Sequence, residues 1–234
     1  MLRSGAYSQK LYDDFQNGRS FDEFIESADE FEKLMSYYWC AVREVETKFR
    51  VLDNQLSLGK KRNPIESIKT RLKSFQSIQG KLQKLEQPLS CNSIENNLND
   101  VAGIRVICSY VDDIYMLADC FLRQDDITLL QKKDYIENPK PNGYKSYHMI
   151  VTVPVYLSDR IVDTKVEIQI RTIAMDFWAS LEHQMRYKKD VCFTKEMERE
   201  LFECAEISAA LDSRMDRLRI SANSKALNKD ILET

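Results

Sequence analysis

Histidine is scarce in this chain of 234 residues, which contains only His148 and His183. Two histidines so far apart do not predict a histidine-rich zinc or iron centre, so we expect oxygen ligands for any metal. The six cysteines include no C-x-x-C pair and have mostly apolar neighbours. We expect them to be reduced thiols in a protein core, because disulfide frameworks and cysteine metal sites show regular spacings.

Long apolar runs are also missing. No stretch approaches the roughly 20 apolar residues of a membrane helix, and the first ten residues lack an apolar segment followed by a small-residue cleavage site. We therefore expect a cytoplasmic protein without a membrane partner. The chain is 43% hydrophobic and 30% charged, with a formal net charge of −3. This composition is typical of globular proteins and argues against a stable nucleic-acid partner.

Two long amphipathic helices are predicted towards the ends of the chain. From residue 21 to about 58, apolar residues recur three and four positions apart, which is the helical period. Ser20 and Glu23 predict a capping box at its start, and Gly59 predicts its end. Residues 194–220 repeat the pattern. Such helices commonly pack on a sheet or on a partner chain.

Strand-like and helical runs alternate between these two helices. This alternation predicts one α/β domain, with a mixed sheet flanked by helices. The predicted strands are 65–73, 102–109, 127–132, 144–155 and 162–171, and the predicted shorter helices are 74–85, 112–122 and 174–187.

The densest polar signal lies between Asn138 and His148. Two prolines and Gly143 predict a turn, since proline restricts φ and glycine permits positive φ. In the strand that follows, alternation places Tyr144, Ser146 and His148 on one face. The opposite face then carries Lys145, Tyr147 and Met149.

A second strand alternates in the same way. Between Thr164 and Arg171, the apolar face holds Val166, Ile168 and Ile170, and the polar face holds Lys165, Glu167, Gln169 and Arg171. If the two strands share a sheet, their polar faces together form the floor of a binding site. The alternative is a half-buried antiparallel sheet with a solvated face.

A basic segment follows the first predicted strand. Arg71 and Lys73 share a strand face, Ser74 is a predicted helix cap, and Ser77 and Lys81 lie one helical turn apart. A helix N-terminus with lysines and a hydroxyl favours phosphate binding. The alternative is a solvated basic helix.

Asp100 and Arg105 flank the start of a buried strand. An arginine in an apolar strand is costly unless its guanidinium meets an anion or a flat partner. Asp100 is either a turn residue or, paired with Glu167, a candidate Mg²⁺ ligand. Magnesium prefers one or two carboxylates together with substrate phosphates and water.

Taken in order, these segments resemble a known family. The motifs are R-x-K-S-x-x-S-x-x-x-K from Arg71, D-x-x-G-x-R from Asp100, P-K-P-N-G-Y-x-S-x-H from Pro139, and E-I-Q-I-R-T-x-A-M-x-x-W-A-x-x-E-H from Glu167. They resemble the synthetase domain of RelA/SpoT-type (p)ppGpp synthetases, especially the RelP-like small alarmone synthetases. The resemblance covers 63–190 and implies an α/β (α+β) nucleotidyltransferase-like domain, with helical extensions at 1–62 and 191–234.

The resemblance also implies an activity and its residues. The family transfers the β,γ-pyrophosphate of ATP to the 3′-hydroxyl of GDP or GTP in the stringent response, with Mg²⁺, and the branch implies a homotetramer. The implied ATP-binding residues are Arg71, Lys73, Ser77, Lys81 and Arg105; the catalytic and metal-binding residues are Asp100 and Glu167; and the acceptor-binding residues are Lys140, Asn142, Tyr144, His148 and Gln169.

The helix after the last motif strand carries a further candidate. Asp176 stands where relatives can carry asparagine, and its carboxylate is suited to accept hydrogen bonds from the N1–H and N2–H₂ donors of guanine. The alternative is a solvent-facing helical aspartate. Core positions are expected for Trp178, Leu181 and Met185, and a structural role for His183.

Two rival functions remain open. The first is a guanine-nucleotide-binding regulator that has lost catalysis, which the presence of Asp100, Glu167 and Tyr144 argues against. The second is an RNA-binding module that uses the basic segment, which the negative net charge disfavours. No His-Asp hydrolase motif is found in the first 60 or so residues, so product degradation is not expected.

Overall fold

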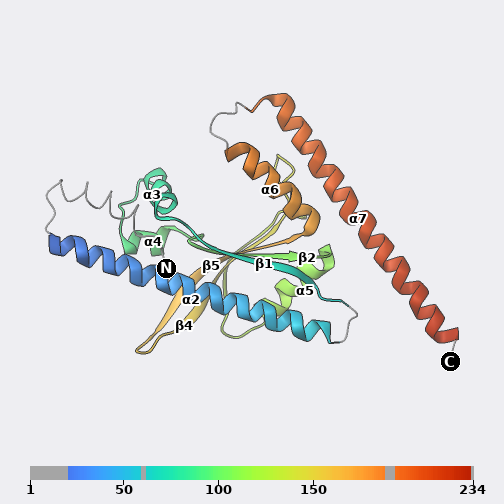
Figure 1. The fold of residues 1–234 in the computed structure, drawn as a ribbon, viewed down its shortest axis with the longest axis horizontal. Coiled ribbons are helices and arrows are strands. Elements are labelled where there is room, and N and C mark those ends of the chain that lie inside the picture. The colour runs from blue at the N-terminus through green and yellow to red at the C-terminus, as the bar shows by residue number, and fades with distance from the viewer. Residues whose placement is uncertain (1–20, 59–61, 188–192, 233–234) are drawn as a thin grey trace.

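A five-stranded mixed sheet forms the centre of the computed structural model, which describes residues 21–58, 62–187 and 193–232 (Figure 1). The strands are β1 (Ile65–Leu72), β2 (Ala102–Cys108), β3 (Thr128–Asp134), β4 (Tyr147–Tyr156) and β5 (Ile161–Thr172). Their order in the sheet is β1-β2-β5-β4-β3. The β2 and β5 strands pair in parallel, and the other neighbours are antiparallel. The predicted mixed sheet is confirmed.

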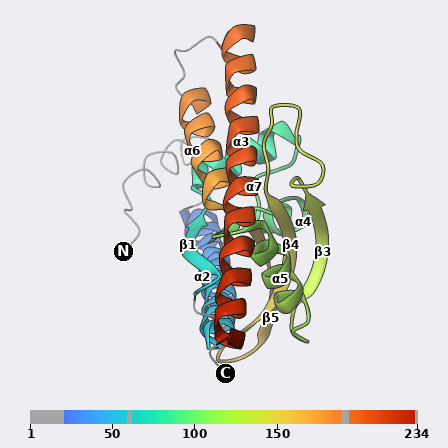
Figure 2. The same ribbon diagram turned by 90° about the vertical axis from the view of Figure 1, so that its right-hand side faces the viewer.

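Helices surround this sheet. They are α2 (Phe21–Ser57), α3 (Phe75–Lys84), α4 (Cys91–Asn97), α5 (Val111–Leu122), α6 (Ile173–Tyr187) and α7 (Lys195–Leu232). The α2 helix crosses the sheet, and the α6 helix packs against α7, β2 and β5. The α7 helix is a single long rod whose C-terminal end projects beyond α6 (Figures 1 and 2). None of the described helices combines the length and the apolarity of a membrane span.

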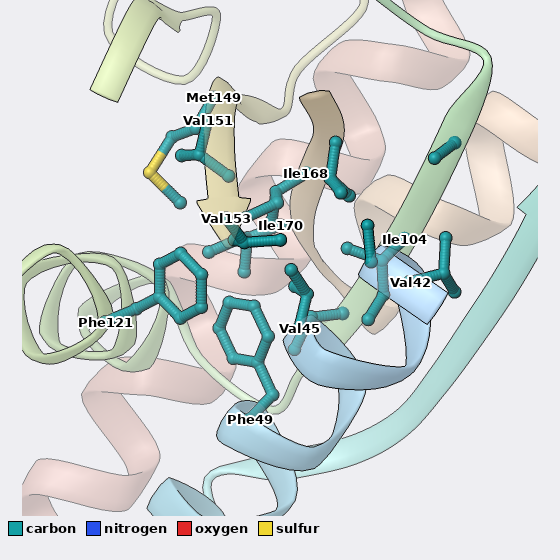
Figure 3. Packing of buried hydrophobic residues seen from close by; sticks show 14 of the residues in the cluster. Val42, Val45, Phe49, Ile104, Phe121, Met149, Val151, Val153, Ile168 and Ile170 are labelled. Carbon is teal, nitrogen blue, oxygen red and sulfur yellow. The ribbon is translucent and has the colours of Figure 1, made fainter. Parts of the chain in front are cut away.

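The hydrophobic core lies between the α2 helix and one face of the sheet. Val42, Val45 and Phe49 point from α2 towards the strands (Figure 3), and all three are fully buried. The Phe49 ring stacks on Phe121 of α5, with 4.6 Å between ring centroids. The strand residues facing them are Ile104, Met149, Val151, Val153, Ile168 and Ile170. The apolar sides of β2, β4 and β5 therefore face the core, and their polar sides face away from it.

The predicted elements agree with the structure in position and type. One helix, α4, was not predicted, because its seven residues are too few to show a helical period. The α7 helix continues to Leu232, past the predicted end at residue 220, and β4 begins at Tyr147 instead of residue 144. The predicted caps Ser20 and Gly59 lie outside the described residues.

Two predicted core positions were wrong. Trp178 is buried at 5% exposure, but Leu181 and Met185 are 41% and 38% exposed. Helical spacing shows that the three residues share a face, but it does not show how far a neighbouring helix covers that face. The indole N–H of Trp178 donates to the Leu201 carbonyl of α7 at 2.8 Å. The cysteines divide in a similar way: those described are all free thiols, Cys108 is buried, and Cys204 is exposed.

Candidate active site

The polar faces of β4 and β5 lie side by side, as the alternation patterns predict for strands of one sheet. His148 is opposite Gln169 across the antiparallel β4–β5 pair, and Glu167 is opposite Gly103 across the parallel β2–β5 pair. A pocket of about 110 Å³ opens on this face of the sheet. It is lined by Lys69, Thr70, Arg71, Gly103, Ile104, Arg105, Glu167 and Gln169. Of the predicted floor, Glu167 and Gln169 line this pocket, and its other lining residues belong to β1 and β2.

Asp100 lies between two lysines at one end of the site. Its carboxylate accepts a hydrogen bond from the Lys73 ammonium, and Lys81 Nζ lies 2.8 Å from its Oδ1 atom. Burial raises the pKa of Asp100, but hydrogen bonding and ion pairing with both lysines outweigh burial and hold the pKa below its ordinary value. Asp100 is therefore ionised at neutral pH, and two predicted phosphate ligands converge on it.

The start of α3 supports these lysines. Ser74 is the N-cap, with an extended backbone and a side-chain oxygen that accepts a hydrogen bond from the Ser77 amide at 3.3 Å. The two hydroxyl groups lie 2.9 Å apart. The predicted cap is confirmed, and it aims the helix N-terminus, where anions are favoured, at the site.

Arg71 of β1 and Arg105 of β2 both line the pocket. The Arg71 side chain lies over Gly103, where an added Cβ would come within 3.2 Å of its Nε atom. Its Nη2 atom lies 3.6 Å from Glu167 Oε2. Arg105 is half-buried and donates from Nη1 to Asp176 Oδ1 at 3.2 Å. The anion expected for an arginine in an apolar strand is therefore Asp176.

Glu167 is the carboxylate at the centre of the floor. Gln169 Nε2 donates to its Oε2 atom at 3.1 Å, and His148 Nδ1 lies 3.8 Å from its Oε1 atom. Both neighbours stand on the same polar face, because β4 and β5 are in register at these residues. Its two oxygens thus have different partners.

Tyr144 and His148 contact each other on the polar side of the sheet. The tyrosine hydroxyl lies 2.7 Å from His148 Nε2. Burial lowers the pKa of His148, and the neighbouring charges of Arg171, Lys140, Lys133 and Arg105 lower it further, to about 3. The imidazole is therefore neutral at physiological pH.

Tyr135 is a site residue that the sequence analysis missed. Its ring lies edge-on to Tyr144 and His148, with centroids 5.9 Å and 5.2 Å away. Lys140 Nζ lies between the two tyrosines, 4.8 Å from the Tyr135 centroid and 4.9 Å from that of Tyr144. No local pattern marks Tyr135, because only the pairing of β3 with β4 brings it beside His148.

Asn142 and Gly143 shape the turn before β4. The Asn142 side chain accepts from the Tyr144 amide at 3.2 Å and donates to Glu182 Oε1 at 3.2 Å. Gly143 has φ of 85°, the left-handed conformation that the turn prediction requires of a glycine. The turn is thereby tied to α6.

Asp176 is surrounded by three cations. Its Oδ2 atom accepts from Lys69 at 3.0 Å, and its Oδ1 atom accepts from Arg105 and Arg171 at 3.2 Å each. Burial raises the pKa of Asp176, but these cations outweigh burial and leave the pKa below its ordinary value. At 8% exposure the residue is not the solvent-facing aspartate of the alternative interpretation. Lys69 was not predicted as a site residue, and Arg171 was predicted on the polar floor without a role of its own.

The mixed sheet carries Asp100 between two lysines, the N-terminus of α3 and an aromatic cluster at Tyr144. Such a combination of anion-binding groups and an aromatic ring is typical of a domain that binds nucleotides and transfers phosphoryl groups. Residues 70–191 match the family model described as a region found in RelA / SpoT proteins. The chain is 40% identical to the GTP pyrophosphokinase YwaC of Bacillus subtilis over 194 residues, which cover 83% of this chain and 92% of the relative. The chain therefore belongs to the RelA/SpoT family.

Solved structures give the same result. Small alarmone synthetase 1 from Bacillus subtilis, bound to its product pppGpp, superposes with a TM-score of 0.75 at 32% identity, over 82% of this chain and 97% of that chain. The same synthetase bound to AMPCPP superposes with a TM-score of 0.70 at 29% identity, over 83% and 98% of the two chains. The fold of this chain is that of the small alarmone synthetases.

Proposed function

We propose that this protein is a (p)ppGpp synthetase, which transfers the β,γ-pyrophosphate of ATP to the 3′-hydroxyl of GDP or GTP. Its family membership and the named activity of its relatives support the proposal. The observation that carries it is the convergence of Lys73 and Lys81 on Asp100, beside a floor that holds Glu167 and ends at Tyr144. Pyrophosphate transfer needs mainly cations, alignment and a polarised acceptor hydroxyl, and these groups supply them.

The donor nucleotide is assigned to the end of the site near α3. Arg71 and Arg105 line the same pocket and would enclose the adenine between their guanidinium groups. Lys73 and Lys81 would exchange Asp100 for the phosphates of ATP, and Ser77 would donate its exposed hydroxyl.

Asp100 and Glu167 are the residues that would hold Mg²⁺. Among the described residues no three histidine, cysteine or acidic side chains gather as a metal cluster, so an ion bound here would take only these two carboxylates from the protein. That supply fits magnesium, which takes its other ligands from phosphates and water. When bound, the ion supplies charge neutralisation at the transferring phosphates.

The acceptor nucleotide is assigned to the Tyr144 end. The Tyr144 ring would stack on guanine after Lys140 moves from the ring face to the acceptor phosphates. His148, Gln169 and Asn142 would orient the ribose and phosphates. Glu167 would accept the proton of the 3′-hydroxyl, and the hydrogen bond from Gln169 to its Oε2 atom would orient the carboxylate.

Asp176 is proposed to read guanine. A carboxylate offers about four lone-pair positions, and three cations already bond to this one. The N1–H and N2–H₂ pair of guanine therefore needs one cation to leave. Lys69 is the partner able to do so, because its side chain is 59% exposed, whereas that of Arg171 is 5% exposed.

The quaternary structure and the cellular setting extend the proposal. We propose a homotetramer that acts in the cytoplasm in stringent-response signalling. The support for assembly is the apolar stripe on α7, where Ile207, Leu211 and Leu218 are 69%, 53% and 64% exposed. The division of the chain into a synthetase domain at 63–190 and helical extensions on either side stays a prediction.

Incubation with γ-³²P-labelled ATP and Mg²⁺ tests the function directly. Purified protein receives GDP, GTP or GMP in separate reactions, and the nucleotides are then separated. We expect label in a guanine nucleotide with the wild-type protein and none with Glu167→Gln. Folded protein that binds ATP but labels no acceptor would instead favour the nucleotide-binding regulator. Tight binding to RNA with a steep salt dependence would favour the RNA-binding module.

A further inference from the structure

Arg171 is the most highly connected side chain in the site, and the proposed mechanism assigns it no role. It stands at the end of β5 with 4% of its surface exposed. All three of its guanidinium nitrogens donate hydrogen bonds. The acceptors are Tyr144 Oη at 2.6 Å, Gln169 Oε1 at 3.0 Å, Asp176 Oδ1 at 3.2 Å and Ser146 Oγ at 3.4 Å.

The arrangement suits arginine and no other cation. A guanidinium is planar and offers five N–H donors in a fixed fork, whereas an ammonium is a single point. The four acceptors come from the turn before β4, from β5 and from α6, so one rigid group ties together three separate segments. Burial of the charge is compensated by Asp176, because a buried cation requires a counter-ion.

We propose that Arg171 is a positioning residue for the acceptor nucleotide, which orients the Tyr144 ring and, through the Tyr144 hydroxyl, selects the tautomer of His148. The role in acceptor binding rests on the proposed function. The direction of the hydrogen bonds from Arg171 to Tyr144 and from Tyr144 to His148 does not depend on the proposed function.

The direction follows from the donors available. A guanidinium has no acceptor, so the Tyr144 oxygen accepts from Arg171. In the proposed arrangement the tyrosine hydrogen points at His148 Nε2, 2.7 Å away, so that Nε2 is the acceptor. A neutral imidazole with an acceptor at Nε2 carries its hydrogen on Nδ1, and Nδ1 faces Glu167 Oε1 at 3.8 Å. Arg171 thus directs a polar N–H at the carboxylate that would accept the hydroxyl proton.

The tautomer is measured by ¹⁵N NMR of the histidine side chains. The chain has two histidines, so a spectrum of His183→Gln assigns the His148 signals by difference. In the wild-type protein we expect a protonated Nδ1 and an unprotonated Nε2. In Arg171→Met and in Tyr144→Phe we expect the Nε2–H form to appear. A wild-type Nε2–H signal overturns the proposal, whatever the protein catalyses.

Steady-state kinetics test the positioning role. For Arg171→Met we expect the KM for GDP or GTP to rise roughly tenfold or more, while the KM for ATP stays near the wild-type value. Arg171→Lys keeps the positive charge beside Asp176 but loses the planar set of N–H donors, so we expect it to raise the acceptor KM as well. Tyr144→Phe removes only the hydroxyl and serves as the matched partner in a double-mutant cycle.

The double variant distinguishes positioning from general damage. Because both substitutions break the same link, Arg171→Met combined with Tyr144→Phe should raise the acceptor KM little more than Arg171→Met alone. The role would be refuted if the double variant raised the acceptor KM by the product of the two single-variant increases. An unchanged acceptor KM in both arginine variants would refute it as well. If Arg171→Met does not fold, Arg171→Lys and Tyr144→Phe still decide the outcome. Absence of transfer by wild-type protein with the expected tautomer would count against the proposed function only.

Discussion

The acidic side chains of the site contact different numbers of cations. Asp100 contacts Lys73 and Lys81, and Asp176 contacts three cations. Within the part of the chain that the structure describes, the one lysine or arginine paired with Glu167 is Arg71, at 3.6 Å. A carboxylate that is fully neutralised is a poor base, because its lone pairs are already occupied. This difference supports Glu167 as the proton acceptor and the two aspartates as binding groups.

Replacement of the Tyr144 ring tests the stacking assignment. For Tyr144→Ala we expect guanine-nucleotide affinity to fall by ~1–3 kcal/mol, roughly 5- to 150-fold in Kd, because base stacking is lost. Calorimetric titration with GDP measures the change, and ATP titration is the control. Tyr156→Ala is the matched variant, since Tyr156 lies at the other end of β4 and is 72% exposed. Equal losses in the two variants would remove the stacking role.

The pH dependence of stability tests the environment of Asp176. Its pKa is lower in the folded protein than its ordinary value of 3.8. The unfolded chain therefore binds the proton first as the pH falls. The stability contributed by the ionised group is complete above the unfolded pKa and is lost as the pH falls through the folded pKa.

For Asp176→Asn we expect the free energy of unfolding to be lower by about 1–3 kcal/mol near neutral pH, since the arginines lose their counter-ion. The difference from wild type should shrink below about pH 4. Urea denaturation between pH 3 and 7 measures both curves. Asp125→Asn, at an exposed loop residue, is the control and should show no such convergence. A difference that is independent of pH would contradict the assigned pKa direction.

At the scale of elements, α7 packs against the turn at Asn142 and Gly143 that precedes β4. Ala205 of α7 is buried against Gly143, and Thr172 at the end of β5 donates to Asp212 of α7 at 2.6 Å. Ser208 donates to the Ala174 carbonyl at 2.9 Å. Movement of α7 would therefore disturb the turn that carries Asn142 and Tyr144.

A pair of glycine substitutions tests this contact. A Cβ at Gly143 would lie 2.6 Å from Ala205 Cβ, on a backbone with positive φ. We expect Gly143→Ala to lower the free energy of unfolding by at least ~1 kcal/mol and to weaken acceptor binding. Gly80→Ala is the matched control, because Gly80 lies within α3 with nothing within 4 Å of an added Cβ, and it should stabilise by ~0.5–1 kcal/mol. Chemical denaturation measures both, and equal stability changes would contradict the close approach.

At the scale of the whole molecule, the described chain leaves an apolar helix face uncovered. One side of α7 contacts the body through Ala205 and Ser208, and another carries Ile207, Leu211 and Leu218 towards solvent. Exposed apolar side chains in a line are typical of an interface between chains. This stripe is where the proposed assembly is expected to be stabilised.

Substitutions in the stripe test the assembly. We expect wild-type protein to sediment as a tetramer, and Ile207→Asp combined with Leu211→Asp to shift it to smaller species, since two buried charges would oppose association. Sedimentation equilibrium measures the mass, and circular dichroism checks the helix content. Glu206→Lys changes an exposed residue off the stripe and should leave the mass unchanged. A monomeric wild type, or a tetramer unaffected by the aspartates, would reject this interface.

Much of the candidate site could be predicted because most of its residues belong to short sequence motifs. Alternation along β4 and β5 identified His148, Glu167 and Gln169 as one polar face, and the cap at Ser74 was evident from residue type alone. Tyr135 and Lys69 were missed as site residues, and Arg171 was placed on the polar floor but given no role. They acquire partners only through strand pairing or helix docking, and no local period records these contacts.

The sequence by itself determined the elements, the side of each strand that faces the core, and the family, because these depend on periodicity and on residue order within a few turns or strand residues. Only the tertiary structure decided which charges meet. It gave Asp176 three cations, from β1, β2 and β5. It also showed that Arg171 donates hydrogen bonds to Tyr144, Ser146 and Gln169. The physical reason is that hydrogen bonds and ion pairs require approach within about 3 Å, which distant segments achieve only once the core has fixed their register.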